Sequence, residues 1–417
     1  MNKMNKTRNV EIRLCLLLAV FIVFALSASA SDECLKCHGE KSIMKASKGE
    51  KLYIDVEKYS SAIHGKLGCR DCHSEMGEVK SSLEHDKNTK VSCENCHDKE
   101  FETYRQSVHG WARKSKKTSP PYCNDCHGSH YISCTSEPDC NVSPINQIKI
   151  CTKCHEDEGV VKDYGLPSVE FIRSYEKSVH GKAIEEKGLL VAAVCSDCHG
   201  SHGIKAVDNP GSLEFKKDIP ALCGRCHKTV EIEYMTGIHW KGIESGKKES
   251  PVCTDCHGEH RILSPQDKNS SVYTVNVPVT CSKCHEDVKL TEVFGMSSNR
   301  YKTYMESFHG VLLEYGEAKA ANCGSCHGVH KILPPSDPAS SVNPENLPVT
   351  CGKCHPQAGV KFKNAKIHIE AKKESSAGKY YVRKFYIWFI GILIVIFASY
   401  VLLEIFNYRS KKKKGES

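Results

Sequence analysis

Cysteine and histidine recur along the chain in one fixed spacing. Of the 417 residues, 25 are cysteine and 22 are histidine. Eleven times the sequence reads Cys-x-x-Cys-His, and these motifs contain 22 of the cysteines. The motifs are Cys34/Cys37/His38, Cys69/Cys72/His73, Cys93/Cys96/His97, Cys123/Cys126/His127, Cys151/Cys154/His155, Cys195/Cys198/His199, Cys223/Cys226/His227, Cys253/Cys256/His257, Cys281/Cys284/His285, Cys323/Cys326/His327 and Cys351/Cys354/His355.

This spacing suits the covalent attachment of haem. Two cysteines three residues apart on one turn can form thioethers to the two vinyl groups of the porphyrin, and the adjacent histidine can then bind the iron from one side. A zinc ribbon needs no histidine after each Cys-x-x-Cys, and a disulfide framework would not place one there every time. The sequence therefore predicts eleven covalently attached haem c groups.

Eleven histidines lie outside the motifs, one for each predicted haem. They are His64, His85, His109, His130, His180, His202, His239, His260, His309, His330 and His368. An iron that is bound by a histidine on each face has no open position. The match in number therefore predicts bis-histidine ligation of every haem, in which all 22 histidines bind iron.

A first group of non-motif histidines follows a tyrosine by five residues and an apolar residue by one, as His109 follows Tyr104 and Val108. The group consists of His64, His109, His180, His239 and His309. The pattern predicts a short helix that ends at the glycine usually found next, such as Gly110. We expect the tyrosine to pack against a haem edge.

A second group comes three residues after a motif histidine, within Cys-His-Gly-x-His-x-Ile, and consists of His130, His202, His260 and His330. Three residues span at most about 10 to 11 Å. Two histidines on opposite faces of one iron have Cα atoms roughly 12 Å apart, given metal to nitrogen bonds of about 2 Å. We therefore expect each histidine of the second group to bind a neighbouring haem, which places successive haems in close contact.

Together the two groups define an internal repeat of about 60 to 70 residues: a first-group histidine, a motif, a second-group histidine and another motif. Four copies begin at His109, His180, His239 and His309, and a divergent first copy begins at His64. In that copy the histidine after the first motif is His85, twelve residues after His73. The motif at His38 and the histidine at position 368 are left over at the two ends, so His85 and His368 depart from the repeat.

The composition favours a fold that is built around cofactors. Residues 31–382 offer only about 32 residues for each predicted haem, and aromatic residues make up 8% of the chain. We expect a mostly irregular chain with short α-helices wrapped around the haems, with little or no β-sheet. Cys134 and Cys140 do not form a twelfth motif because Asn141 follows, and an oxidising compartment favours a disulfide between them.

The two ends of the chain carry targeting signals. Residues 1–30 have a basic start, an apolar run from Leu14 to Leu26 and small residues before Ser31, which predicts a signal peptide cleaved after Ala30. Cys15 falls in that segment and has no predicted role. An uncleaved anchor is the alternative, although 13 apolar residues are short for a span of about 20.

A second apolar run predicts a transmembrane helix over residues 385–404, followed by a basic tail over residues 405–417. An exported chain that is halted by one such helix leaves its C-terminus in the cytoplasm and its haem domain, residues 31–382, in the periplasm. Basic and acidic side chains balance in that domain, so it has no basic surface for nucleic acid.

The repeated motifs resemble the doubled-CxxCH, cytochrome c3-like superfamily of multihaem c-type cytochromes, and the plan is similar to its membrane-anchored periplasmic members. The resemblance covers the region from the motif at His38 to the motif at His355. It implies electron exchange with a membrane quinone-linked cytochrome b or another redox subunit. The anchor is C-terminal here, whereas the NapC/NirT quinol dehydrogenases carry theirs at the N-terminus.

These features predict an electron carrier, with no catalytic residue, that relays electrons between the quinone-linked membrane chain and periplasmic redox proteins in anaerobic respiration. Histidine pairs favour low reduction potentials, which suit menaquinone. The alternative is a multihaem reductase or oxidoreductase for a small nitrogen or sulfur compound, which needs one haem with an open iron position. A subunit of an extracellular haem filament is a third hypothesis, which a membrane helix disfavours.

Overall fold

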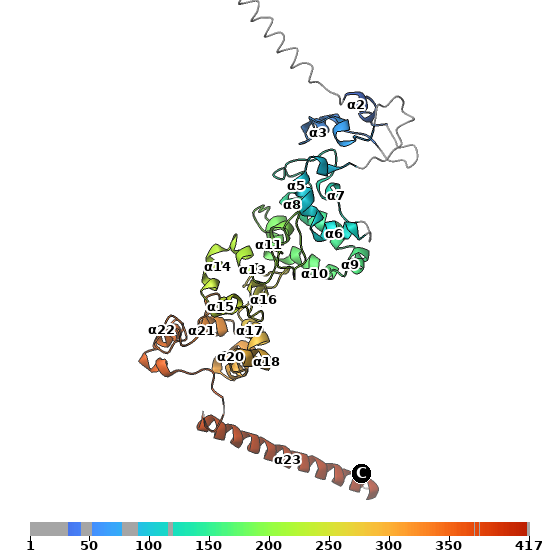
Figure 1. Cartoon of the computed structure of the whole chain (residues 1–417). Helices are drawn as coiled ribbons and strands as arrows, with labels where there is room; N and C mark the ends of the chain where they lie inside the picture. The colour runs from blue at the N-terminus through green and yellow to red at the C-terminus, as the bar shows by residue number, and fades with distance from the viewer. Residues whose placement is uncertain are drawn as a thin grey trace, which may run out of the picture. The chain divides into compact units, whose positions relative to one another are not determined.

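The computed structural model describes residues 32–42, 52–76, 91–115, 120–370, 372–374 and 376–414. The predicted signal peptide, Cys15 and His85 lie outside these residues. Within them, the regular elements are all helices, joined by turns and irregular segments, and no strand occurs (Figure 1). This confirms the prediction of a helical and irregular fold without a sheet.

Contacts divide the chain into two units, Met1–Phe215 and Lys216–Ser417. The boundary falls within the third copy of the repeat, between the motifs at His199 and His227. The single haem domain expected over residues 31–382 stays a prediction.

In the part of the first unit that the structure describes, the helices are short. They are α2 (Asp32–His38), α3 (Val56–Ser61), α4 (Cys69–Cys72), η1 (Cys93–Asn95), α5 (Asp98–Arg105), α6 (Val108–Lys114), α7 (Cys123–His127), α8 (Pro144–His155), α9 (Glu158–Tyr164), α10 (Val169–Arg173), η2 (Ser174–Lys177), α11 (Val179–Glu185) and α12 (Cys195–His199).

The second unit continues the same pattern and ends in one long helix. Its helices are α13 (Ile219–Gly224), α14 (Lys228–Met235), α15 (Ile238–Glu244), α16 (Cys253–His257), α17 (Val277–His285), α18 (Val288–Val293), α19 (Arg300–Met305), α20 (Phe308–Glu314), α21 (Cys323–His327), α22 (Leu347–Gly352), η3 (Val360–Asn364) and α23 (Ala377–Lys414).

Four of the motifs are themselves helices of five residues, α7, α12, α16 and α21. In α7 the carboxylate of Asp125, between the two cysteines, accepts a hydrogen bond from the backbone N–H of Tyr122 at 2.7 Å and so caps the first turn. Gly128 follows with φ at 79°, in the left-handed region that favours glycine. This turn ends the helix directly after the motif histidine and leads the chain to His130.

Four of the five first-group histidines lie at the start of a helix, so the expected helix stop was wrong there, whereas His64 lies in a turn after α3. In the second copy α5 ends at Arg105, and α6 begins at Val108, next to His109. Ser107 caps α6 by accepting a hydrogen bond from the N–H of Gly110 at 3.1 Å. Gly110 lies inside α6, where a Cβ atom would run into the carbonyl oxygen of Tyr104. The glycine therefore allows two consecutive helices to approach closely, which a search for helix stops misses.

Few apolar side chains are buried, and they form small clusters in place of one core. One cluster joins Ile219, Ile243 and Val252, with motif cysteines 223 and 253 packed against it. Clusters of this size resemble the satellite groups of a larger domain and not its centre. The described side chains are therefore too few to form one continuous core, as expected for a chain that is wrapped around cofactors.

Cys134 and Cys140 are both free thiols, so the expected disulfide was wrong. Cys140 is buried and Cys134 is exposed. Cys140 lies 17 residues after the first cysteine of its motif, where the three following copies have the buried serines 212, 270 and 340. Cys140 therefore fills a small buried position in a loop that the copies share.

The C-terminal helix α23 is long and apolar enough to cross a membrane. The candidate span is Ala377–Lys411, and none of its most apolar window is buried against the rest of the chain. The helix includes the predicted segment 385–404 and extends it at both ends, because the basic residues around Arg383 and Arg409 continue the same helical backbone.

Candidate haem sites

The structure brings sixteen of the predicted ligands together as eight pairs of histidine rings, with centroids 5.9 to 6.3 Å apart. The pairs are His64–His97, His73–His130, His109–His155, His127–His202, His239–His285, His257–His330, His309–His355 and His327–His368. Each pair joins one motif histidine to one non-motif histidine.

These distances match two imidazoles on opposite sides of one iron. Two metal to nitrogen bonds of about 2 Å and about 1.1 Å from each ring nitrogen to its ring centre place the centroids about 6.2 Å apart. Within the described parts of the chain, no group of three or more His, Cys, Asp or Glu side chains is arranged to hold a metal ion directly. The arrangement fits haem, whose porphyrin supplies the four remaining iron ligands.

Seven of the eight pairs fall into two classes that alternate along the repeat. A first-group histidine pairs with the second motif of its own copy, and the interplanar angles are 50° to 63°. A second-group histidine pairs with the first motif of the preceding copy, as His130 does with His73, at angles of 25° to 27°. The second class agrees with the limited reach of three residues, which prevents His130 from serving the adjacent His127.

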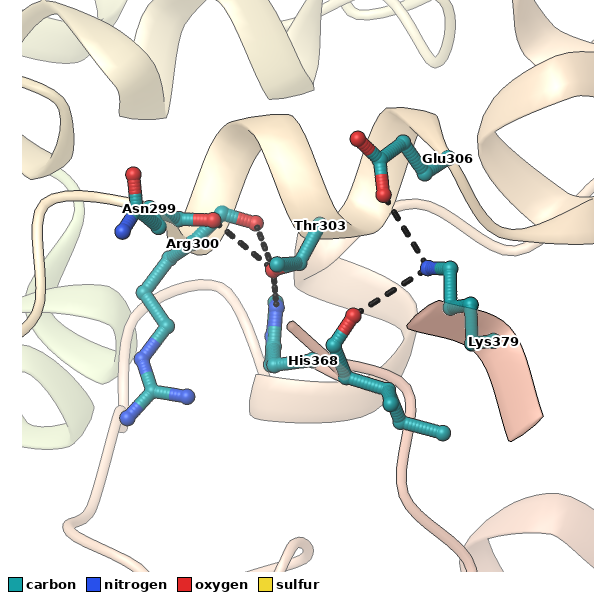
Figure 2. A network of polar contacts seen from close by, with 7 residues as sticks. Asn299, Arg300, Thr303, Glu306, His368 and Lys379 are labelled. Carbon is teal, nitrogen blue, oxygen red and sulfur yellow. Dashed lines mark hydrogen bonds and ion pairs between the residues drawn. The ribbon is translucent and has the colours of Figure 1, made fainter. Parts of the chain in front are cut away.

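His368 takes the place of a second-group histidine at the end of the repeat. Its ring lies 6.3 Å from that of His327, at an interplanar angle of 40°. Its Nδ1 atom is 3.0 Å from the hydroxyl oxygen of Thr303 in α19. Figure 2 shows this contact, together with Lys379 of α23, which binds the Glu306 carboxylate and the carbonyl oxygen of Ile369.

The contacts of the Thr303 hydroxyl fit one tautomer of His368. The hydroxyl oxygen lies 2.8 Å from the carbonyl oxygen of Asn299 and 3.1 Å from that of Arg300 (Figure 2). When its single proton goes to one of these carbonyls, the hydroxyl accepts a hydrogen bond from Nδ1 of His368. In that arrangement Nε2 of His368 keeps its lone pair for a metal.

Thr303 was not identified from the sequence. It lies six residues before the first-group histidine of its copy, His309. The residue at the same position before His239 is Glu233, whose carboxylate is 3.5 Å from Nδ1 of His330. The position thus contacts a ligand of the neighbouring site in two copies, although the residues found there in the five copies share no single chemistry.

Backbone hydrogen bonds join consecutive copies at the same place. The N–H of the apolar residue before a first-group histidine donates to the carbonyl of the isoleucine in Cys-His-Gly-x-His-x-Ile of the next copy. The bonds are Ile63 to Ile132 at 2.9 Å, Val108 to Ile204 at 2.8 Å and Ile238 to Ile332 at 2.7 Å. These hydrogen bonds therefore form a joint between consecutive copies. The joint lies next to a first-group histidine of one copy and close to a second-group histidine of the next copy.

The repeated tyrosine ties the first-group helix to the next motif. Its hydroxyl donates to the carbonyl two residues before the first motif cysteine in all five copies. The bonds are Tyr59 to Leu67 at 2.9 Å, Tyr104 to Pro121 at 2.5 Å, Tyr175 to Ala193 at 2.5 Å, Tyr234 to Pro251 at 2.7 Å and Tyr304 to Ala321 at 2.8 Å. Burial raises the pKa of each tyrosine, which keeps the hydroxyl protonated as a donor. Packing against a haem edge stays a prediction.

Neighbouring motifs touch through their first cysteines. Five such contacts occur, each between consecutive motifs of the sequence. They join Cys34 to Cys69, Cys93 to Cys123, Cys151 to Cys195, Cys223 to Cys253 and Cys281 to Cys323. Porphyrins attached to cysteines in contact lie close together, so these contacts agree with successive haems at short range.

The second cysteines of the motifs are placed differently from the first, and none of them takes part in these five contacts. All eleven first cysteines, including Cys351, are half-buried. The exposed second cysteines are Cys37, Cys72, Cys96, Cys198, Cys226 and Cys354, and the half-buried ones are Cys126, Cys154, Cys256, Cys284 and Cys326. The motif Cys-x-x-Cys-His gives no sign of which cysteine is more buried, so the sequence did not predict this difference. The structure therefore groups the first attachment points of neighbouring motifs, while the thioether expected at each second cysteine stays a prediction.

The environment of three of the paired imidazoles, those of His109, His239 and His327, favours the neutral form that metal binding requires. Burial, and then the paired ring, lowers the pKa of His109 and of His239 to about 4. Burial, followed by His368 and other nearby cations, lowers the pKa of His327 to about 4. The backbone carbonyl of Leu52 lies 3.0 Å from Nδ1 of His38, a contact that orients this ring in the same way as Thr303 orients His368.

One motif histidine has a carboxylate beside it that the sequence reading missed. Oε1 of Glu214 is in contact with Nδ1 of His199, and the Glu214 side chain is 12% exposed. Burial raises the pKa of this carboxyl, but the bond from His199 and a hydrogen bond from Ser212 outweigh burial and lower it. The structure therefore places the Glu214 carboxyl group next to a predicted iron ligand.

The remaining predicted ligands stay predictions. His85 lies outside the described residues, and His38 is its candidate partner by elimination. The histidines at positions 180, 199, 227 and 260 belong to the third copy and its neighbour, on both sides of the unit boundary.

Comparisons with known proteins agree with this geometry. The family described as Doubled CXXCH motif matches residues 189–231, which contain the motifs at His199 and His227. Cytochrome c-type protein NrfB of Escherichia coli is 27% identical over 161 residues, 36% of this chain and 73% of that protein. No solved structure matches the chain. The motifs, the paired histidine rings and these two likenesses together identify the chain as a multihaem c-type cytochrome.

Proposed function

We propose that the protein is an electron carrier with eleven haem c groups, each held between two histidines, and that it has no substrate-binding iron. The observation that carries this proposal is the pairing of the rings. All eight pairs within the units have the separation that two ligands on one iron require. An imidazole on each face leaves no position for a substrate, which favours a carrier over a reductase.

When bound, the haems supply one-electron oxidation and reduction and electron transfer between close neighbours. The residues of the chain fix the spacing and orientation. Contacts such as Cys281 with Cys323 hold consecutive attachment points together. Joints such as Ile238 to Ile332 fix a ligand of one copy over a motif of the preceding copy. Burial lowers the pKa of imidazoles such as those of His109 and His239, which favours their neutral, metal-binding form.

The membrane helix gives the carrier its place in the cell. We infer that α23 crosses the cytoplasmic membrane once, with the haem domain in the periplasm and the basic tail in the cytoplasm. The segment with His368 lies directly before α23, and Lys379 in the first turns of α23 binds Glu306 of the haem domain. The site at His327 is therefore the candidate for exchange with a quinone-linked cytochrome b or another membrane redox subunit, and periplasmic redox proteins would be served elsewhere along the chain.

Likeness to a cytochrome c-type protein supports the carrier assignment. The name of the Escherichia coli relative states a c-type cytochrome. Service in anaerobic respiration, between menaquinone and periplasmic acceptors, follows from the low potentials that bis-histidine ligation favours.

The test is the coordination state of all irons in the full-length protein. The mature chain should begin at Ser31, and its intact mass should exceed the mass of the polypeptide by eleven additions of about 0.6 kDa. Electron paramagnetic resonance of the oxidised protein should show low-spin ferric haem and no stoichiometric high-spin signal. Carbon monoxide should not bind rapidly to the reduced protein, because every sixth position is filled.

Two results would contradict the proposal in different ways. Fewer haems by mass would overturn the count, and zinc in place of haem would overturn the cofactor. One full equivalent of high-spin haem would identify an open iron and favour the reductase for a small nitrogen or sulfur compound. The site at His38 is where such an opening is expected first, since His85 departs most from the repeat.

A further inference from the structure

The four regular copies share a loop of constant length between their two motifs. In each of them 28 residues separate the first cysteines of the two motifs, as from Cys195 to Cys223. Positions in this loop therefore correspond one to one without insertions. The residue 15 positions after the first motif histidine is Val142, Val272 or Val342 in three copies and Glu214 in the third copy.

Glu214 is held in place from both sides. Oε2 accepts a hydrogen bond from the hydroxyl of Ser212 at 2.8 Å, and Oε1 contacts Nδ1 of His199. The same hydroxyl accepts from the backbone N–H of Glu214 at 3.2 Å. The corresponding serine in the fifth copy, Ser340, donates instead to the carbonyl of Leu333 at 3.1 Å. The serine hydroxyl thus donates to the carboxylate in the third copy and to a backbone carbonyl in the fifth copy.

A carboxylate on the outer nitrogen of an iron-bound imidazole acts on the metal in two ways. It accepts the Nδ1 proton, which orients the ring and raises the basicity of the nitrogen that binds the metal. Its negative charge also stabilises the more positive, oxidised state of the iron. Both effects lower a reduction potential, which is one of the main means by which a protein tunes a haem. A valine at this position offers neither effect.

We propose that Glu214 is a positioning residue that sets the haem at His199 to a lower reduction potential than its counterparts at His127 and His327. The haem at His257 is left out of this comparison, because the Glu233 carboxylate lies 3.5 Å from Nδ1 of His330, its second candidate ligand. This inference rests on the proposed attachment of a haem at His199 and adds an order of potentials along the repeat. A low-potential site in the third copy places an unfavourable step near the middle of the chain of haems. Such a step separates the haems before it from the haems after it.

The experiment compares Glu214→Val and Glu214→Gln in the full-length protein with the unaltered chain. Valine is the residue of the other copies, and glutamine keeps an oxygen acceptor without the charge. Reduction is followed optically against applied potential, and the haem content of each variant is measured by intact mass. In Glu214→Val, one of the eleven one-electron reduction steps should shift to higher potential. Its equilibrium constant for reduction should rise tenfold or more, which corresponds to about 59 mV. Glu214→Gln should shift the same step by less.

The reciprocal variant is Val272→Glu, which introduces the carboxylate near His257. One electron should then move to lower potential, and a shift to higher potential would overturn the inference. A titration of Glu214→Val that superimposes on that of the unaltered protein would also overturn it. Loss of a haem from both Glu214 variants would do the same, since Glu214 would then serve attachment. Absence of the haem at His199 from the unaltered protein would instead refute the proposed function.

Discussion

Replacement of His368 by alanine should open one iron position in the whole chain. His368 faces His327 with ring centroids 6.3 Å apart, and Thr303 holds its outer nitrogen. It lies outside the five copies, on the segment that leads to the membrane helix. The substitution therefore removes one ligand and leaves the joints between copies intact.

The size of the effect follows from the number of haems. One iron in eleven, or about 9% of the total, should change from six-coordinate low-spin to five-coordinate or water-bound high-spin. Electron paramagnetic resonance of the oxidised variant should show one equivalent of high-spin ferric haem per protein. The reduced variant should bind one equivalent of carbon monoxide rapidly.

Lys366→Ala is the matched control, because this exposed lysine lies two residues away on the same segment. It should bind no carbon monoxide. An unchanged spectrum in His368→Ala would refute the assignment of His368 as a ligand. Several equivalents of high-spin haem would refute the view that this segment serves a single site.

Three other expectations concern stability, membrane attachment and ligand orientation. Tyr304→Phe removes a buried hydroxyl that donates to Ala321 at 2.8 Å, so thermal unfolding should show a loss of about 1 kcal/mol, whereas Tyr315→Phe, at a side chain that is 85% exposed, should change nothing. A chain that ends at Ser376 should leave the membrane fraction and keep its haems, and its retention in membranes would contradict the role of α23 as the anchor. Low-spin signals in electron paramagnetic resonance should fall into two sets, for near-parallel and strongly tilted imidazole planes, and a single set would contradict the two classes of angle.

Much of the site could be predicted because covalent attachment leaves a rigid signature in the sequence. The motif predicts two thioether positions and one ligand, and counting the other histidines predicts a second ligand for each iron. In eight cases the structure brings a motif ring and a non-motif ring together. The reach of three residues excluded His127 as the ring partner of His130, and the structure pairs His130 with His73. Composition was enough to predict short helices and no sheet.

The rest depends on contacts that are distant in sequence. Gly110 looked like a helix stop, yet the approach of two helices around Tyr104 explains it. Cys140 looked like half of a disulfide, yet it replaces a buried serine of the other copies. Alignment of the copies with one another explains both positions, because it shows which residues all copies share and where one copy differs. The same alignment marks Glu214.

The pairing of the rings explains why the repeat needs a special ending. A first motif takes its second ligand from the following copy, as His127 takes His202. The fifth copy has no following copy, so its first motif at His327 would lack a ligand. The segment with His368 supplies it, and Thr303 and Lys379 hold that segment against α19 and the start of α23. Terminal units of repeat proteins depart from the common pattern where a neighbour is missing. In this chain the departure also joins the His327–His368 pair to α23, the candidate membrane span, through the contacts of Lys379 with Glu306 and Ile369.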